Sequence, residues 1–440
     1  MEIGIIGILA LFALLALGVH IGVALCVVGM GGIAYIVGPL PALSSAPEAI
    51  YHKVASYELV TIPLFVLMGY LASAGGVSER LFETLNAWVG RLRGGLGIST
   101  VVSCTAFGTV CGSSLVTSSV FAKLCAPAMR KYGYDKKIAY GICSSGGMIG
   151  MLIPPSILMV VYGIQSGDSI GKLLVAGVTP GLLLMVLFSI TIVIMAVKFP
   201  KWINEPIPEG KPDWKLRFKL LGSIWQLWIV AVVIFGGIFG GLFNPTEAAA
   251  VATAFLIVLL IFTNKFNWRK LRPLLVESFT ETASTTCMIF LVMGGASVFS
   301  QFLVMSGVTF GIADWVREMD FSMGQLIWVF IFAYCVLGCF LDSTSMVCIT
   351  VPIFNPIVKD LGADPIWYAV VAVMAMEVGL LTPPVGLNVY GAYSVAEKDV
   401  TLENIFAGGF PFFGAVWLAI VILVFFPDVS TFLPALMLDR

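Results

Sequence analysis

The sequence predicts an all-α polytopic membrane protein built from two repeats of opposite orientation. Three observations predict this fold class: the apolar composition, the clustering of basic residues, and a resemblance between the two halves of the chain. Of 440 residues, 59% are hydrophobic and 11% are charged, whereas soluble domains are about a quarter charged. The net charge of −1 offers no basic field for nucleic acid. Soluble enzymes, nucleic-acid binders and disordered scaffolds are therefore excluded.

Apolar runs follow one another along the whole chain with short polar stretches between them. Since a crossing takes ~20 apolar residues, the chain has room for about ten transmembrane helices. The N-terminus lacks the basic region of a cleaved signal, so the first run is expected to be a retained membrane helix. The runs lie near residues 3–18, 21–38, 59–75, 98–129, 138–162, 174–197, 221–243, 247–263, 283–305, 324–358, 366–390 and 404–426.

Basic residues orient these runs, because positively charged loops stay in the cytoplasm. The run 98–129 has basic residues on both flanks, so it is expected to enter and leave on one side as a re-entrant hairpin with a glycine-rich tip at 108–114. A single long span is the alternative. Counting the crossings backward from the cytoplasmic loops places the N-terminus outside. Sixteen of the 24 basic residues lie in four stretches, at 91–93, 130–137, 198–219 and 265–272.

The run 324–358 resembles a second hairpin, with its tip at 338–345 and with flanks of mixed charge. The amphipathic segments 77–93 and 308–320 are expected to be interfacial arm helices that lie along the membrane surface.

An internal repeat relates the two halves. The segment GMLIPP at 150–155 matches GLLTPP at 379–384, and the same offset along the chain maps Pro127 onto Pro356 and Ser114 onto Ser343. The first hairpin is expected to open from the cytoplasm and the second from outside. Inverted repeats with broken helices are the architecture of secondary transporters.

The repeat divides the chain into residues 1–220 and 221–440. The first half is expected to contain scaffold helices (1–95), a hairpin (98–129), a broken helix (138–162), a closing helix (174–197) and a basic cytoplasmic loop (198–219). The second half is expected to contain helices (221–305), an interfacial helix (308–320), a hairpin (324–358), a broken helix (366–390) and a closing helix (404–426).

The proline pairs at 154–155 and 383–384 interrupt their helices in mid-span. Two successive prolines remove two amide donors, and unpaired backbone at membrane depth is tolerated only where it is buried or lines a cavity. The freed carbonyls can face a cation. Kinks in packed helices are the alternative, but kinks need not repeat with matching tips.

Each tip adds hydroxyl oxygens, which suit Na⁺ and other hard cations. The helix N-termini after the tips suit a carboxylate. We therefore expect a substrate site between the tips, formed by Ser113, Ser114, Asp342, Ser343, Thr344, Ser345 and Asn388.

Three ionisable residues lie deep in apolar runs and are functional candidates. Asp342 lies in the second tip, where it can accept a hydrogen bond from a hydroxyl or amide group of the substrate or compensate Na⁺. Glu377 can orient the tip or pair with a base, and Lys123 is best explained as a snorkelling side chain. The nine cysteines and two histidines show no zinc-site spacing, so the cysteines are expected to pack between helices.

Several motifs together resemble the large membrane subunit of TRAP transporters, the tripartite ATP-independent periplasmic uptake systems. The resemblance covers essentially the whole chain. Its motifs are GSS…APAMRKYGYD (112–135), GGMIGMLIPPSI (146–157), YGIQSGDSIGKL (162–173), NPTEAAA (244–250) and GLLTPPVGLN (379–388).

The resemblance implies Na⁺-coupled uptake of a small carboxylate such as a sialic acid or dicarboxylate, across the bacterial cytoplasmic membrane, with no cofactor. It implies an elevator-type movement of the hairpin-bearing domain and two partners: a small four-helix membrane subunit and a periplasmic substrate-binding protein. The N-terminus would then be periplasmic. The Na⁺ sites carried over by motif and repeat symmetry are Gly338, Gly379, Thr382 and Val385, with Gly108, Ser113, Ser114, Gly150, Ile153 and Ser156.

Two other functions fit less well. A stand-alone ion-coupled carboxylate transporter of the same superfamily would share the hairpins but need no binding protein. An intramembrane enzyme would need a nucleophile, base or metal set, which two histidines near the membrane ends do not supply.

Overall fold

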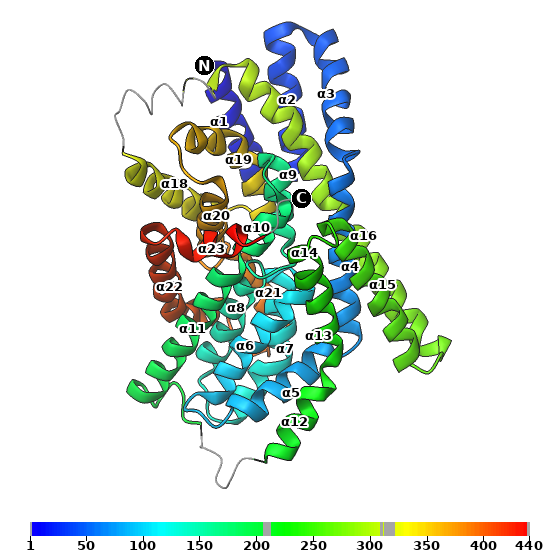
Figure 1. Ribbon diagram of the computed structural model, residues 1–440. Coiled ribbons are helices and arrows are strands. Elements are labelled where there is room, and N and C mark those ends of the chain that lie inside the picture. Colours follow the sequence, from blue (N-terminus) through cyan, green and yellow to red (C-terminus); the bar gives the residue numbers. More distant parts are fainter. Residues whose placement is uncertain (1, 206–212, 309–310, 312–321, 438–440) are drawn as a thin grey trace.

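The computed structural model describes residues 2–205, 213–308, 311 and 322–437, and over these ranges the chain is almost entirely helical (Figure 1). Most of the predicted segment 308–320 therefore lies outside the described residues. The helices of the first half are α1 (Glu2–Ala16), α2 (Ile21–Val37), α3 (Pro39–Val54), the 3₁₀ turn η1 (Tyr57–Val60), α4 (Thr61–Ala74), α5 (Val77–Val89), α6 (Gly95–Cys111), α7 (Ser114–Lys131), α8 (Lys136–Ile149), α9 (Ile157–Ser166), α10 (Ile170–Ala176) and α11 (Val178–Lys198).

The second half begins with a bent segment and continues with longer helices. Its elements are α12 (Trp214–Ser223), α13 (Trp225–Ala231), the π turn η2 (Val232–Gly236), α14 (Gly237–Phe239), α15 (Pro245–Thr263), α16 (Trp268–Met305), α18 (Met323–Gly338), α19 (Ser343–Asp360), α20 (Pro365–Gly379), α21 (Leu387–Tyr393), α22 (Leu402–Phe425) and α23 (Asp428–Ala435).

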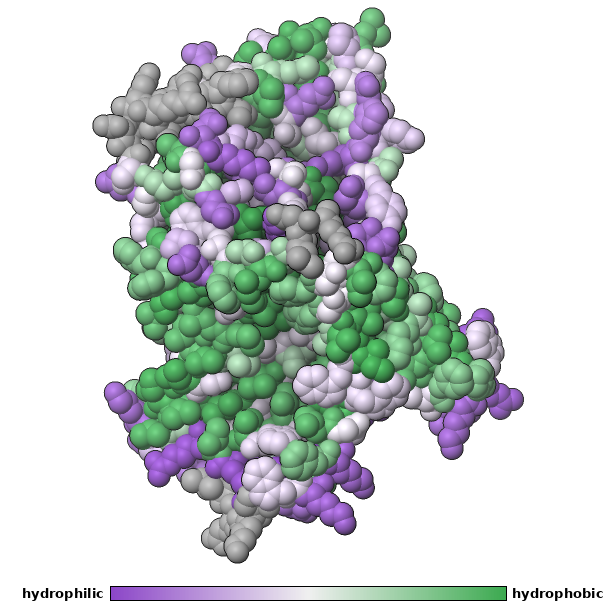
Figure 2. All heavy atoms as spheres, viewed as in Figure 1, coloured by the Kyte–Doolittle hydropathy of each residue, from purple (hydrophilic) through white to green (hydrophobic). Residues whose placement is uncertain are grey.

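The chain is a multi-pass membrane protein by its helix lengths and composition. Within the described ranges, five helical segments are long and apolar enough to cross a membrane, or six if α12 and the segment after it, bent by 53°, form one span. Figure 2 shows a broad hydrophobic band across one face, with hydrophilic residues on both sides of it. Several other apolar helices are only 10–17 residues long, so the expected total of about ten spans stays a prediction.

Two regions differ from the sequence-based boundaries. Residues 39–54, which lie between two of the predicted apolar runs, form α3, where Pro39 occupies the first turn, a position at which its missing N–H costs nothing. The apolar run 283–305 is only the second part of α16, which begins at Trp268. Three of the four basic residues at 265–272, namely Arg269, Lys270 and Arg272, therefore lie in a helix, because Lys, Arg and Leu continue a helix readily beyond its apolar part.

The helices form two groups, which we call the outer group (α1–α5 and α12–α16) and the hairpin group (α6–α11 and α18–α23). In the outer group, α16 packs against α2, α3 and α4. In the hairpin group, α8 packs against α6, α7 and α22. The groups meet most extensively where α5 packs against α6, and also where α4 contacts α6 and α9 and where α16 contacts α19.

The two halves of the hairpin group interlock reciprocally. The helix after the first break, α9, packs against α19 of the second half, whereas α21, after the second break, packs against α7 of the first half. The helices before the breaks begin alike. Asp135 caps α8 by accepting the Lys137 N–H at 2.8 Å, and Asp364, its counterpart in the repeat, caps α20 by accepting the Ile366 N–H at 2.7 Å.

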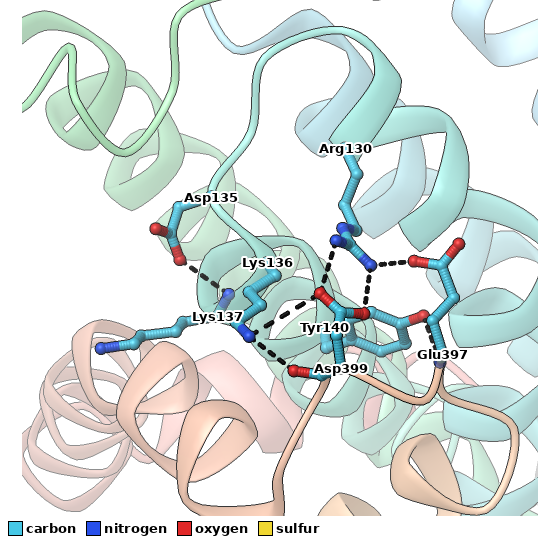
Figure 3. A network of polar contacts seen from close by, with 7 residues as sticks. All are labelled: Arg130, Asp135, Lys136, Lys137, Tyr140, Glu397 and Asp399. Carbon is cyan, nitrogen blue, oxygen red and sulfur yellow. Dashed lines mark hydrogen bonds and ion pairs between the residues drawn. The ribbon is translucent and has the colours of Figure 1, made fainter.

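Ion pairs reinforce this interlocking at two places. Arg130, at the end of α7, bonds Asp399 through both terminal nitrogens (2.9 and 2.8 Å) and also contacts Glu397 (Figure 3). Lys359, the repeat counterpart of Arg130 at the end of α19, pairs with Asp168 at 2.7 Å. Each pair joins the second arm of one hairpin to the loop after the broken helix of the other half.

Candidate functional site

The two hairpin tips meet the two broken helices at paired glycines. A Cβ added at Gly108 would lie 2.5 Å from the Cα of Gly150, and one added at Gly338 would lie 2.8 Å from the Cα of Gly379. Real Cβ atoms do not approach other atoms so closely, so a side chain at Gly108, Gly338 or Gly379 would force the tip away from the break. At Gly150 an added Cβ would be tight but not excluded, with the Thr117 hydroxyl oxygen at 3.1 Å.

A backbone hydrogen bond also ties each break to its tip. The Ile157 N–H donates to the Gly112 carbonyl at 3.4 Å, and the Val385 N–H donates to the Cys339 carbonyl at 3.3 Å. Gly112, at the first tip, has a φ of +62°, a left-handed conformation that glycine adopts without strain. Both Pro-Pro bonds, at 154–155 and 383–384, are cis.

The residues expected to hold Na⁺ gather in two sets, one at each break. The first set is Gly108, Gly150, Ile153 and Ser156, with Ser113 and Ser114 at the tip, and the second is Gly338, Gly379, Thr382 and Val385. The Ser156 hydroxyl donates to the Met151 carbonyl, and the Thr382 hydroxyl donates to the Val378 carbonyl at 2.8 Å. Because their hydrogens are engaged, these hydroxyls have only lone pairs left for a further partner.

A cavity of about 360 Å³ lies between the tips and the outer group. Six of the seven residues expected to bind substrate line it, namely Ser113, Ser114, Asp342, Ser343, Thr344 and Asn388. The seventh, Ser345, is fully buried and bonds Asp342. Of the residues expected to hold Na⁺, only Ser113 and Ser114 line this cavity.

Asp342 is the N-cap of α19. Its carboxylate accepts the Ser345 N–H at 3.1 Å and also the Ser345 hydroxyl. The corresponding residue of the first tip, Ser113, caps α7 by accepting the Val116 N–H at 3.4 Å. The positive end of α19 is thus already occupied by a carboxylate, which makes this end a poorer receptor for a substrate anion than the sequence suggests.

Glu377 lies behind the cavity wall, with no exposed surface. Its carboxylate accepts the Ser343 hydroxyl at 3.1 Å and the Asn388 side-chain amide at 3.1 Å. The Ser114 side chain is a third hydrogen-bonding neighbour. The carboxylate therefore connects residues of both tips with the second broken helix, whereas Lys123 is exposed on α7.

The opposite wall comes from the outer group and was not anticipated from the sequence. Tyr70 of α4 and Glu281, Ser284, Thr285 and Met288 of α16 line the cavity there. The sequence does carry a signal, since a run of Glu, Ser and Thr at 277–286 overlaps the start of the apolar run 283–305. In the described ranges, no group of His, Cys, Asp and Glu side chains could hold a metal ion.

Comparisons with known proteins agree on one family. The sequence profile of the "Tripartite ATP-independent periplasmic transporter, DctM component" matches residues 8–429. The chain is 35% identical to the C4-dicarboxylate TRAP transporter large permease protein DctM of Pseudomonas aeruginosa, over 86% of both chains. It is 30% identical to the ectoine/5-hydroxyectoine TRAP transporter large permease protein UehC of Ruegeria pomeroyi, over 97% of both.

A solved structure resembles the fold at low sequence identity. The YdaH transporter of Alcanivorax borkumensis superimposes with a TM-score of 0.62 over 89% of both chains, at 13% identity. The likeness supports a transporter-type helical fold.

Proposed function

The chain belongs to the tripartite ATP-independent periplasmic transporters as a DctM-type large permease subunit, and we propose that it carries a small organic acid into the cell together with Na⁺. One observation carries the proposal: both hairpin tips, both breaks and the outer group meet around one cavity lined by hydroxyl, amide and carboxylate groups. The matched relatives are permeases rather than enzymes.

The substrate site of the proposal is the cavity between the tips. Its volume of about 360 Å³ suits a molecule of the size of a dicarboxylate or a sugar acid. Ser113, Ser114, Ser343, Thr344 and Asn388 supply polar contacts. The matched relatives are named for dicarboxylates and for ectoine. Membership of the family therefore does not identify which organic acid this chain transports.

The coupling sites of the proposal lie at the two breaks. A Na⁺ ion at the first break would take oxygens from Gly108, Gly150, Ile153 and Ser156, with Ser113 and Ser114 at the tip. A second ion would take oxygens from Gly338, Gly379, Thr382 and Val385. Carbonyl and hydroxyl oxygens are the ligands that hard cations prefer, and the helices on both sides of each break leave carbonyls without a helical partner.

Movement of the hairpin group against the outer group would carry the cavity across the membrane in an elevator mechanism. The tight packing within the hairpin group, through Gly108, Gly150, Gly338 and Gly379, favours motion of that group as one body. The cavity also has one wall from each group. A sliding movement would therefore open it to one side and then to the other.

The complete transporter would contain three proteins in and at the bacterial cytoplasmic membrane. The partners are a small four-helix membrane subunit and a periplasmic substrate-binding protein, and the N-terminus of this chain would face the periplasm. A stand-alone carboxylate transporter is the competing possibility.

Uptake into proteoliposomes tests the proposal. We expect the chain and its small subunit to accumulate a labelled organic acid only with the binding protein and an inward Na⁺ gradient. Equal uptake with choline in place of Na⁺ would contradict Na⁺ coupling. Uptake by this chain alone would favour the stand-alone carrier.

A further inference from the structure

The buried carboxylate of Glu377 is balanced by neutral hydrogen-bond donors. A carboxylate at this depth is costly unless it is hydrogen-bonded. Its partners are the Ser343 hydroxyl and the Asn388 amide, each at 3.1 Å, with Ser114 as a further neighbour. Among the ion pairs of the described residues, none involves Glu377.

These bonds fix which atoms face the cavity. An ionised carboxylate only accepts hydrogen bonds, so its partners must turn their hydrogens toward it. The Ser343 hydroxyl then has only lone pairs left for the cavity. In Asn388 the amide nitrogen points to Glu377, so the side-chain oxygen points elsewhere. Both residues line the cavity, Ser343 at its surface with 3% of the residue exposed and Asn388 directly behind that surface with none exposed.

The Asn388 oxygen is the second, independent observation. Asn388 is fully buried, and its side-chain oxygen is buried without a hydrogen-bond partner. An unpaired buried acceptor is unfavourable and rare in folded proteins. A donor from a molecule that presses between the side chains of this wall would satisfy it.

The charged side chains that line the cavity are both carboxylates. Asp342 and Glu281 are acceptors, and the lining contains no Lys, Arg or His among the described residues. A substrate carboxylate placed against Asn388 and Ser343 would meet oxygen lone pairs and neighbouring negative charge.

We propose that Glu377 is a positioning residue that turns oxygen lone pairs of Ser343 and Asn388 toward the cavity side of this wall, so that the wall receives the hydroxyl or ammonium donors of the substrate and not its carboxylate. The inference rests on the proposed uptake of an organic acid and specifies its chemistry: the acid carries a hydroxyl or ammonium group besides its carboxylate.

The test compares succinate, malate and aspartate, which carry hydrogen, hydroxyl and ammonium at the same carbon. Apparent affinities come from the rise in unfolding temperature of the purified two-subunit complex in Na⁺, without binding protein. We expect the wild type to bind malate or aspartate roughly tenfold more tightly than succinate. Glu377→Gln keeps the side-chain size but adds a donor, so at least one partner must turn, and the preference should disappear.

Several results would overturn the inference: no stabilisation by any of the three acids, equal binding of succinate and malate by the wild type, or an unchanged preference in Glu377→Gln. If Glu377→Gln altered only the rise in unfolding temperature caused by Na⁺, and not that caused by the acids, the wall would be a cation site instead. Wild-type uptake measured in parallel separates the two proposals, because loss of Na⁺-driven uptake with an intact binding preference counts against the transport function alone.

A second variant and a control guard against misfolding. Ser343→Ala removes one of the oriented oxygens without adding a donor, and we expect it to reduce the preference severalfold. Glu403→Gln makes the same chemical change as Glu377→Gln at an exposed position in the first turn of α22, and it should bind all three acids as the wild type does.

Discussion

The two breaks of the hairpin group share a backbone plan but differ in their surroundings. Both have a glycine pair, a cis Pro-Pro bond and a hydrogen bond from the residue after the break to the tip. At the first break, residues 152–156 are all buried. At the second, Pro383 and Pro384 are exposed, and Pro383 lines a separate cavity with Thr382 and three phenylalanines of α22 (Phe406, Phe410 and Phe413).

The side chains differ even more than the exposure. The cap of the first tip is Ser113, whereas that of the second is Asp342. Met148 stands at the position of the first half that corresponds to Glu377 in the second. The comparison teaches that the common backbone provides two equivalent turns, while both carboxylates at the tips and breaks come from the second half.

The largest effect should come from the glycine pairs, where the halves are most alike. Gly108→Ala and Gly379→Ala would each place a Cβ 2.5 Å from a backbone Cα, so both should abolish uptake and strongly destabilise the complex. Gly409→Ala is the matched control, because its Cβ would lie 3.6 Å from the Ser145 hydroxyl. Uptake and unfolding temperature are the measurements. Full activity of one glycine variant, with loss in the other, would break the equivalence of the backbones.

The second-largest effect should be a difference between the two breaks in how their side chains affect the Na⁺ dependence of uptake. Thr382→Val removes a hydroxyl oxygen from the second break, so we expect the Na⁺ concentration for half-maximal uptake to rise about tenfold, the cost of losing one hydrogen-bond-strength contact. Ile153→Val, at the corresponding position of the first break, removes only a methyl group and should leave it unchanged. Equal shifts in both variants would mean that the Thr382 side chain does not contact the ion.

The sequence predicted local features better than contacts between distant segments. Residues 108–114 and 338–345 contain the helix ends at Gly112 and Gly338, because glycine and hydroxyl residues determine helix ends locally. The outer wall with Glu281 and Ser284 was missed, because it depends on α16 packing beside α19. The sequence suggested that Glu377 could orient the tip, but its hydrogen bonds with Ser343 and Asn388 could not be read, since they depend on how the second tip and α21 pack beside α20.

A smaller difference is expected between the two ion pairs that join the halves. The Asp168 side chain is 10% exposed in its pair with Lys359, whereas that of Asp399 is 52% exposed beside Arg130. Asp168→Asn should therefore cost roughly 1–2 kcal/mol, between the values for exposed and buried pairs, and Asp399→Asn clearly less. Unfolding temperatures of the two variants decide this, and a larger loss in Asp399→Asn would reverse the comparison.

The smallest effect concerns pH at the exposed pair. Hydrogen bonding from Arg130 lowers the pKa of Asp399 below its ordinary value. A lowered folded-state pKa stabilises the folded state above the unfolded pKa of about 3.9, and this contribution is lost as the pH falls through the folded pKa. The stability difference between wild type and Asp399→Asn should thus be constant at neutral pH and vanish only in acid. A difference that changes between pH 6 and 8 would contradict this.

The most direct test of the substrate site is a structure of the purified complex with Na⁺ and a transported acid, determined by electron cryomicroscopy. We predict density for the acid in the cavity between the tips, with a hydroxyl or ammonium group against the Asn388 oxygen and Ser343. Density for the acid outside this cavity, or a carboxylate group seated on Asn388 and Ser343, would contradict the account.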